Sequence, residues 1–104
     1  MWIFLNDSFL SIVEDLDNTT NLLVRARIEG DIERVFPQAE VSHTPDHDYY
    51  YRTSLPRKEV AARIADKITA VNYPNFKNTV KDMERHEAYF DVWEIMQREG
   101  DRRA

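Results

Sequence analysis

The stretch LLVRARIEGDIERVFP, residues 22–37, changes its hydrophobic pattern halfway along, at Gly30. From residue 23 to residue 28, apolar and polar side chains alternate, which is typical of a half-buried β-strand. Successive side chains of a strand point to opposite faces of the sheet, so one set should face the core and the other the solvent. The expected core set is Val24, Ala26 and Ile28, and the expected solvent set is Arg25 and Arg27.

The second half of the same stretch has the spacing of a short helix. Gly30-Asp31 offers a break and a helix start, and Pro37 is a stop because proline cannot continue a helix. Between these two points three apolar residues recur at helical spacing, namely Ile32, Val35 and Phe36. The stretch therefore predicts a strand that leads directly into a helix.

Before this stretch the sequence predicts a β-hairpin. Two β-rich runs, residues 2–5 and 9–14, are separated by Asn6-Asp7-Ser8, which has the composition of a turn. The first run is apolar, but it has no basic leader and polar residues interrupt it. We therefore expect strands here, and neither a signal peptide nor a membrane span.

After the stretch we expect two more strands and two longer helices. Residues 40–44 fit a brief strand, and residues 49–55 alternate without indicating which side is buried. One side carries Tyr49, Tyr51, Thr53 and Leu55, and the other carries Tyr50, Arg52 and Ser54. Pro56 suits the first turn of a helix whose apolar residues are Val60, Ile64, Ile68 and Val71. A last helix over residues 84–98 has an apolar stripe of Tyr89, Val92, Trp93 and Met96.

The order of these elements predicts an α+β fold in which helices cover one face of an antiparallel sheet. The central part resembles a ferredoxin-like (split βαβ) arrangement, preceded by the N-terminal β-hairpin. A chain of 104 residues fits one domain, expected over residues 1–99. Gly100 should end the last helix, which leaves residues 100–104 as a flexible tail.

Composition narrows the classes of function. The chain has no cysteine, which excludes disulfides, thiolate metal sites and a cysteine nucleophile, and which fits a reducing cytoplasm. The net charge of −5 makes a dedicated nucleic-acid binder unlikely on charge grounds, because neutralising phosphates requires a clustered basic surface. There is no glycine-rich phosphate loop, and no cofactor is expected.

The segment HTPDHD, residues 43–48, contains imidazole and carboxylate groups, which bind zinc, manganese or iron. However, Pro45 interrupts the H-x3-H spacing, so the two histidines do not share one face of a helix. Thr-Pro-Asp is also ordinary turn chemistry, and a turn is the preferred interpretation. The alternative is a metal-dependent enzyme that uses His43, Asp46, His47 and Asp48.

Tyrosines and arginines gather in two segments and raise two binding hypotheses. Sheets that display aromatics and arginines stack the bases of single-stranded nucleic acid, but the ribonucleoprotein motif is missing here. Tyrosine and arginine are also the residues most often found as anchors of protein interfaces. The candidate binding surface is Arg25, Arg27, Tyr50 and Arg52.

Four fragments of the chain, MWIFLNDSFLSIVED, LLVRARIEGDIERVFP, HDYYYRTSLPRKEVA and NYPNFK…HEAYFDVWEIM, carry a resemblance. Together they resemble a group of short bacterial and phage proteins of about this length. The resemblance covers most of the chain and implies no activity and no catalytic residue. Its most characteristic pieces are Asp48-Tyr49, Tyr51-Arg52 and Asn75-Phe76-Lys77.

The hypothesis that follows is a small cytoplasmic module that binds a protein partner without catalysis. An accessory or inhibitory factor of bacterial or phage origin fits this description. The identity of the partner and the oligomeric state are left open, a dimer included. Metal-dependent catalysis and single-stranded nucleic-acid binding are the two alternatives.

Overall fold

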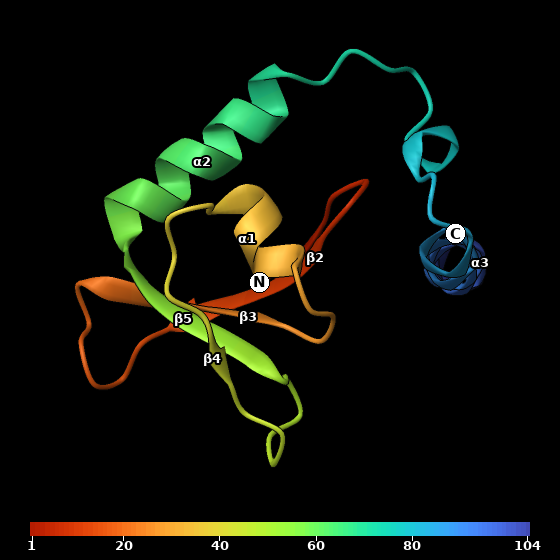
Figure 1. Ribbon diagram of the computed structural model, residues 1–104. Helices are drawn as coiled ribbons and strands as arrows, with labels where there is room; N and C mark the ends of the chain where they lie inside the picture. The colour runs from red at the N-terminus through yellow and green to blue at the C-terminus, as the bar shows by residue number, and fades with distance from the viewer. The chain divides into compact units, whose positions relative to one another are not determined.

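The computed structural model describes residues 1–104, and internal contacts divide the chain into two compact units, Met1–Asn72 and Tyr73–Ala104 (Figure 1). The first unit holds the sheet and two helices, and the second holds a 3-10 turn and the longest helix. A division into compact units is a different property from independent folding. The single domain expected over residues 1–99 therefore stays a prediction.

The first unit is built on a five-stranded sheet in which all neighbouring strands run antiparallel. The spatial order is β1-β2-β3-β5-β4, so the edges are β1 and the very short β4. The α+β class and the antiparallel sheet are thus confirmed. The strands are β1 (Trp2–Phe4), β2 (Phe9–Glu14), β3 (Asn21–Ala26), β4 (Ser42–His43) and β5 (Tyr51–Pro56).

The ferredoxin-like arrangement is not confirmed. A βαβ unit joins parallel strands, whereas β3 and β5 are antiparallel neighbours, in a register that pairs Val24 with Thr53. The chain passes between them through a short helix and β4, which ends up outside β5 at the sheet edge. Sequence alternation identifies a strand, but the partner of each strand is set by long-range pairing.

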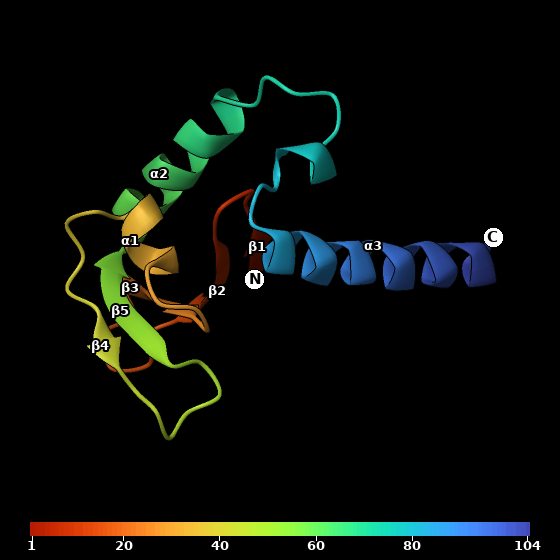
Figure 2. The ribbon, with the colours of Figure 1, turned by 45° about the vertical axis from the view of Figure 1, so that its right-hand side comes forward.

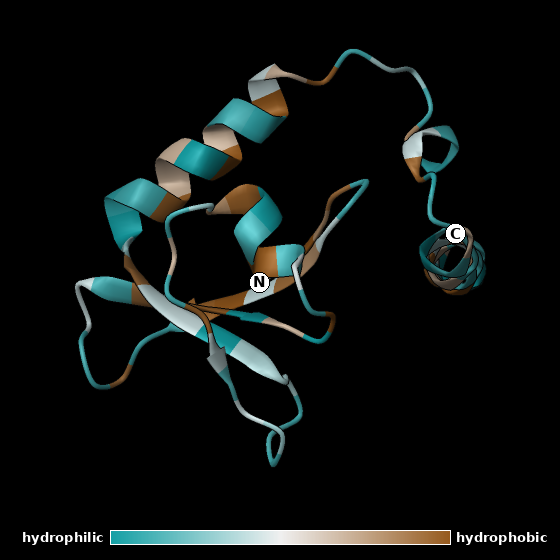
Figure 3. Ribbon diagram, viewed as in Figure 1, coloured by the Kyte–Doolittle hydropathy of each residue, from teal (hydrophilic) through white to brown (hydrophobic).

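Two helices of the first unit, α1 (Asp31–Val35) and α2 (Arg57–Thr69), lie on the same side of the sheet (Figures 1 and 2). Hydrophobic segments of both helices and of the central strands meet there (Figure 3). Alternation in β2, β3 and β5 supplies the sheet half of this core, because every second side chain faces the helices. The core consists of Leu10, Ile12, Val24, Ala26, Ile32, Val35, Phe36, Leu55 and Val60.

The predicted facing of residues 23–28 is right for the strand and wrong beyond it. Val24 and Ala26 are fully buried, as expected. Ile28, however, is 51% exposed, so the prediction that it faces the core is wrong. Strand β3 ends at Ala26, and the chain then turns toward Gly30, whose φ of 92° lies in the left-handed region that favours glycine. Alternation that continues past the end of a strand no longer reports which face is buried.

The short helix α1 is anchored to the sheet through its first residue. Asp31 is fully buried, and its Oδ2 accepts a hydrogen bond of 2.9 Å from the backbone N–H of Phe9, at the start of β2. Its Oδ1 accepts a charged hydrogen bond of 2.8 Å from Arg34. An acidic residue in the first turn of a helix interacts favourably with the helix dipole. The structure shows that it also satisfies the backbone of a neighbouring strand.

The second unit consists of the 3-10 turn η1 (Lys77–Thr79) and helix α3 (Met83–Arg103). The side chain of Asp82 caps α3 by accepting a hydrogen bond of 2.9 Å from the N–H of Arg85. The ring of Phe76 stacks on Tyr89, with centroids 5.9 Å apart, and the Lys77 ammonium lies 3.8 Å from the ring centroid of Trp93. Aromatic packing therefore joins the turn to the first half of the helix.

The predicted end of the last helix is wrong. Helix α3 continues through Gly100 to Arg103, so residues 100–103 are helical and do not form a tail. Glu99 pairs with both Arg102 and Arg103, one turn later, which supports the last turn. These hydrogen bonds also hold the pKa of Glu99 below its ordinary value. Neither α3 nor any other helix of the chain has the length and apolar character needed to cross a membrane.

Candidate functional site: the open face of the sheet

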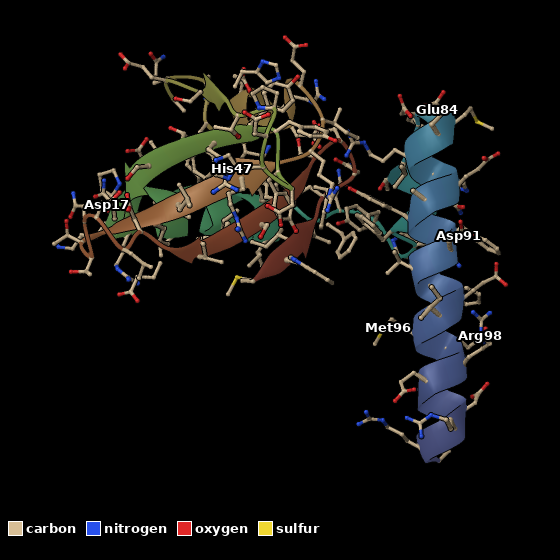
Figure 4. All side chains as sticks on the ribbon, turned by 90° about the horizontal axis from the view of Figure 1, so that it is seen from below. Asp17, His47, Glu84, Asp91, Met96 and Arg98 are labelled. Carbon is tan, nitrogen blue, oxygen red and sulfur yellow. The ribbon has the colours of Figure 1, made fainter.

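A row of five residues crosses the whole sheet on the face opposite α1 and α2. The registers place Trp2 opposite Ser11, Ser11 opposite Arg25, Arg25 opposite Arg52, and Arg52 opposite Ser42. Directly opposed residues of antiparallel strands project on the same face of the sheet. We call this face, seen in Figure 4, the open face, because no helix of the first unit covers it.

Arg25 lies at the centre of this row, and only some of its guanidinium N–H donors make hydrogen bonds within the protein. Its Nη2 donates a hydrogen bond of 2.7 Å to the hydroxyl oxygen of Ser11, which is itself buried. Its Nε–H is buried and meets no hydrogen-bond acceptor. Because a guanidinium carries five N–H donors, Arg25 retains unused donors on a face that no helix of the first unit covers.

Two arginines share the ring of Tyr49 as a platform. The guanidinium carbon of Arg25 lies 4.5 Å from the ring centroid, and that of Arg27 lies 5.0 Å from it. Cations within about 6 Å of an aromatic face are attracted by the ring quadrupole. Tyr49 is only 6% exposed, so the ring is a fixed support for both guanidinium groups.

Arg52 completes the cluster from the neighbouring strand. Its Nε donates to the carbonyl oxygen of Tyr49 at 3.4 Å, and its Nη2 lies 3.3 Å from the carboxylate of Asp48. Asp48 is the one carboxylate that pairs with any of these three arginines, and its side chain is 65% exposed. We call Arg25, Arg27 and Arg52, with Tyr49 beneath them, the arginine cluster.

The opposite end of the open face carries a small polar network instead. The Ser54 hydroxyl donates to the Asp15 carboxylate at 2.5 Å and accepts a hydrogen bond of 3.0 Å from the Asn21 side chain. The bond from Ser54, followed by one from the N–H of Asp17, holds the pKa of Asp15 below its ordinary value of 3.8. The open face is therefore cationic at one end and anionic at the other.

The segment proposed as a metal site is a turn held by its own backbone. The N–H of Thr44 donates to the carbonyl of Tyr50 at 2.6 Å, and the N–H of His47 donates to the carbonyl of Thr44 at 3.1 Å. His43 belongs to β4, and its ring stacks on Tyr51, with centroids 5.1 Å apart. His47, labelled in Figure 4, lies in the turn itself.

These residues do not assemble into a metal centre. Nowhere does the structure bring three His, Asp or Glu side chains into a group that could hold a metal ion. Asp48 instead accepts hydrogen bonds from the N–H of Tyr49 and from Arg52. The metal hypothesis for His43, Asp46, His47 and Asp48 therefore draws no support from the geometry.

The three consecutive tyrosines have three different environments. Tyr49 is buried under Arg25 and Arg27, and Tyr51 packs against the core on the helix side of the sheet. Only Tyr50 is well exposed, at 44%, and it lies just before β5. The geometry thus gives little support to stacking of nucleic-acid bases on a row of tyrosines.

Apolar side chains lie in the row that holds Arg25 and Arg52 and in the rows next to it. Trp2 is 68% exposed, and its ring packs edge-on against Phe9, with centroids 6.3 Å apart. Val13 and Leu23 are opposed on β2 and β3 and are half-buried. Aromatic and arginine side chains beside half-buried aliphatic ones form the composition typical of a protein interface.

A second feature, an aliphatic groove, lies between α2 and strands β1, β2 and β3 on the other side of the sheet. Its volume is about 480 Å³. The apolar stripe of α2 is well buried only near its start, at Val60, whereas Ile68 is 67% exposed. The lining comprises Met1, Ile3, Ile12, Val13, Glu14, Leu22, Arg57, Val60, Ala61, Ile64, Ala65 and Ile68.

The structure brings together three of the four predicted surface residues. Arg25, Arg27 and Arg52 meet at Tyr49, whereas Tyr50 makes no hydrogen bond or ring contact with them. Sequence reasoning missed the roles of Tyr49 as a support and Trp2 as the far end of the row. No local pattern reports them, because they depend on the register between strands.

Comparison with known proteins gives no relative for this chain. It matches no protein-family model, no curated protein and no solved structure.

Proposed function

We propose that this protein is a binding module that recognises a protein partner through the open face of its sheet. The observation that carries the proposal is the direct cross-strand opposition of Arg25 and Arg52, which contact the ring and the backbone carbonyl, respectively, of the same buried residue, Tyr49. Directly opposed like charges destabilise a sheet, so such a pair gains nothing for folding. A surface that retains it is best explained by a ligand that contacts it.

The surroundings of the arginine cluster favour a protein over other partners. Interface anchors are enriched in tryptophan, tyrosine and arginine, and exposed Trp2 lies in the same cross-strand row as both arginines. The distance from Trp2 on β1 to Arg52 on β5 spans three strand spacings, or about 14 Å. An extended segment of a partner crossing the strands can contact both.

Two further points belong to this proposal. A cytoplasmic accessory or inhibitory factor of bacterial or phage origin agrees with the lack of cysteine. Binding alone accounts for the groups present on the open face, and no reaction is assigned to them.

The test compares three forms of the full chain, immobilised and exposed to a lysate of the source cells. These forms are the unmodified chain, Arg25→Glu/Arg52→Glu, and the control Arg102→Glu/Arg103→Glu, which changes two arginines at the end of α3. We expect a protein that is retained by the unmodified chain and the control but lost by the first variant. Identical sets of retained proteins on all three forms would exclude the open face as the binding surface.

A further inference from the structure

We infer that the segment recognised by the arginine cluster is acidic, so that carboxylates of a partner protein bind between Arg25, Arg27 and Arg52. This inference rests on the proposed function and adds the chemical class of the partner. It follows from the supply of unused donors, from the local charge and from how firmly the three cations are held.

The donors of the cluster are not consumed within the protein. Arg25 makes one side-chain hydrogen bond, from Nη2 to Ser11, so Nη donors of its guanidinium remain unused; its Nε–H is buried and is not among the donors that a partner can reach. The Arg27 side chain makes no hydrogen bond or ion pair, and its guanidinium lies over the Tyr49 ring. Guanidinium groups present paired donors that match the two oxygens of a carboxylate.

The local charge is strongly positive within an acidic chain. The three guanidinium groups have a single carboxylate partner among them, that of Asp48, which pairs with Arg52 at 3.3 Å and whose side chain is 65% exposed. An exposed pair of this kind contributes little to stability, so exchanging it for a partner's carboxylate costs little. The chain as a whole carries a net charge of −5. The cluster is therefore a local concentration of positive charge on an acidic protein.

The cations are held in place before any ligand binds. The Tyr49 ring supports Arg25 and Arg27, and its carbonyl oxygen accepts a hydrogen bond from Arg52. Because Tyr49 is buried, the three side chains lose less freedom on binding than surface arginines normally do. The half-buried side chains Phe9 and Leu23 on the same face favour a polypeptide over a phosphate backbone.

The experiment is a solution NMR titration of the ¹⁵N-labelled full chain with a capped hexaglutamate peptide. Two comparison ligands are a capped hexalysine peptide and a six-nucleotide oligothymidylate. We expect hexaglutamate to shift the Nε–H signals of Arg25, Arg27 and Arg52 and to leave those of Arg102 and Arg103 unchanged. Binding should weaken as salt is raised, because exposed charges are screened.

The variant series separates the cluster from general charge effects. Arg25→Gln/Arg52→Gln should weaken hexaglutamate binding about tenfold or more, because it removes two cations that donate charge-assisted hydrogen bonds to the carboxylates. Arg27 lies beyond the end of β3 and is exposed. The substitution Arg27→Gln should therefore weaken hexaglutamate binding without affecting the fold. The control Arg102→Gln/Arg103→Gln should bind hexaglutamate like the unmodified chain.

Two outcomes would overturn the inference. If oligothymidylate shifted the same arginine signals and bound as tightly as hexaglutamate, the inferred partner would be a nucleic acid and not an acidic protein. If neither hexaglutamate nor oligothymidylate shifted these signals, an anionic partner would be excluded. In that case the protein-binding proposal is judged separately by the lysate comparison. A partner still lost in Arg25→Glu/Arg52→Glu would keep the surface and change only the partner's chemistry.

Discussion

Arg25 of β3 and Arg52 of β5 are directly opposed across the sheet, and both contact the same residue, Tyr49. The ring of Tyr49 lies under the guanidinium of Arg25 at 4.5 Å, and its carbonyl oxygen accepts the Nε–H of Arg52 at 3.4 Å. One buried residue thus positions both cations on the open face. The consequences for stability and binding can be measured.

Replacing the ring of Tyr49 should destabilise the protein far more than removing its hydroxyl group. Tyr49→Ala removes a buried aromatic side chain and its cation–π contacts, and it should lower the free energy of unfolding by about 3 kcal/mol. Tyr49→Phe retains the ring and should stay within about 0.5 kcal/mol of the unmodified chain. Urea unfolding measures both. Equal losses in the two variants would assign the role to the hydroxyl group instead.

The buried carboxylate of Asp31 should be a main anchor of α1. Asp31→Ala leaves the buried N–H of Phe9 without this acceptor, and we expect a loss of about 2–3 kcal/mol in the free energy of unfolding. Asp31→Asn retains an acceptor oxygen and should cost less. Denaturant unfolding of the two variants checks this order. A cost below about 0.5 kcal/mol for Asp31→Ala would show that packing alone holds α1.

Filling the aliphatic groove from α2 should stabilise the first unit. Ala65 lines the groove and Ala62 of the same helix does not, so Ala65→Leu and Ala62→Leu form a matched pair with the same change in helix propensity. Partial burial of the added methylene groups should make Ala65→Leu more stable than Ala62→Leu by about 1 kcal/mol. Thermal unfolding compares them. Equal stability would mean that the groove does not accept the side chain.

Stability at acid pH should depend on the bond between Ser54 and Asp15. A carboxyl group whose pKa is lowered by folding stabilises the protein at pH above its ordinary value of 3.8, and this contribution is lost as pH falls through the lowered pKa. Ser54→Ala removes the main cause, so the pKa of Asp15 should rise toward 3.8. Carbon-detected NMR titration of the Asp15 carboxyl reports the value. No rise in the pKa would exclude Ser54 as its cause.

Parts of the fold that depend on local pattern could be predicted from the sequence. Alternation placed Val24 and Ala26 in the core and Arg25 on the opposite face, as the structure shows. Helical spacing after Gly30 identified α1, because proline and glycine act on the backbone within one or two residues. Alternation, helical spacing and the positions of glycine and proline are local features, so they can be interpreted without knowing which strands are neighbours.

Predictions at the ends of elements were less accurate. Gly100 was expected to stop the last helix, but α3 continues to Arg103 with Glu99 paired to the arginines one turn later. A glycine ends a helix only when the chain adopts the left-handed conformation there, and otherwise it costs only about 1 kcal/mol within the helix. The residue type alone does not report which of these applies.

The sequence by itself determined the class of the fold, the helical and extended segments, and which arginines point away from the core. These follow from periodicity, a property of neighbours along the chain. Only the tertiary structure decided that β3 pairs with β5, and hence that Arg25 is opposed to Arg52 and that both contact Tyr49. Strand pairing joins residues about 27 positions apart through backbone hydrogen bonds that are nearly the same for every sequence. Their register emerges only when the whole core is packed.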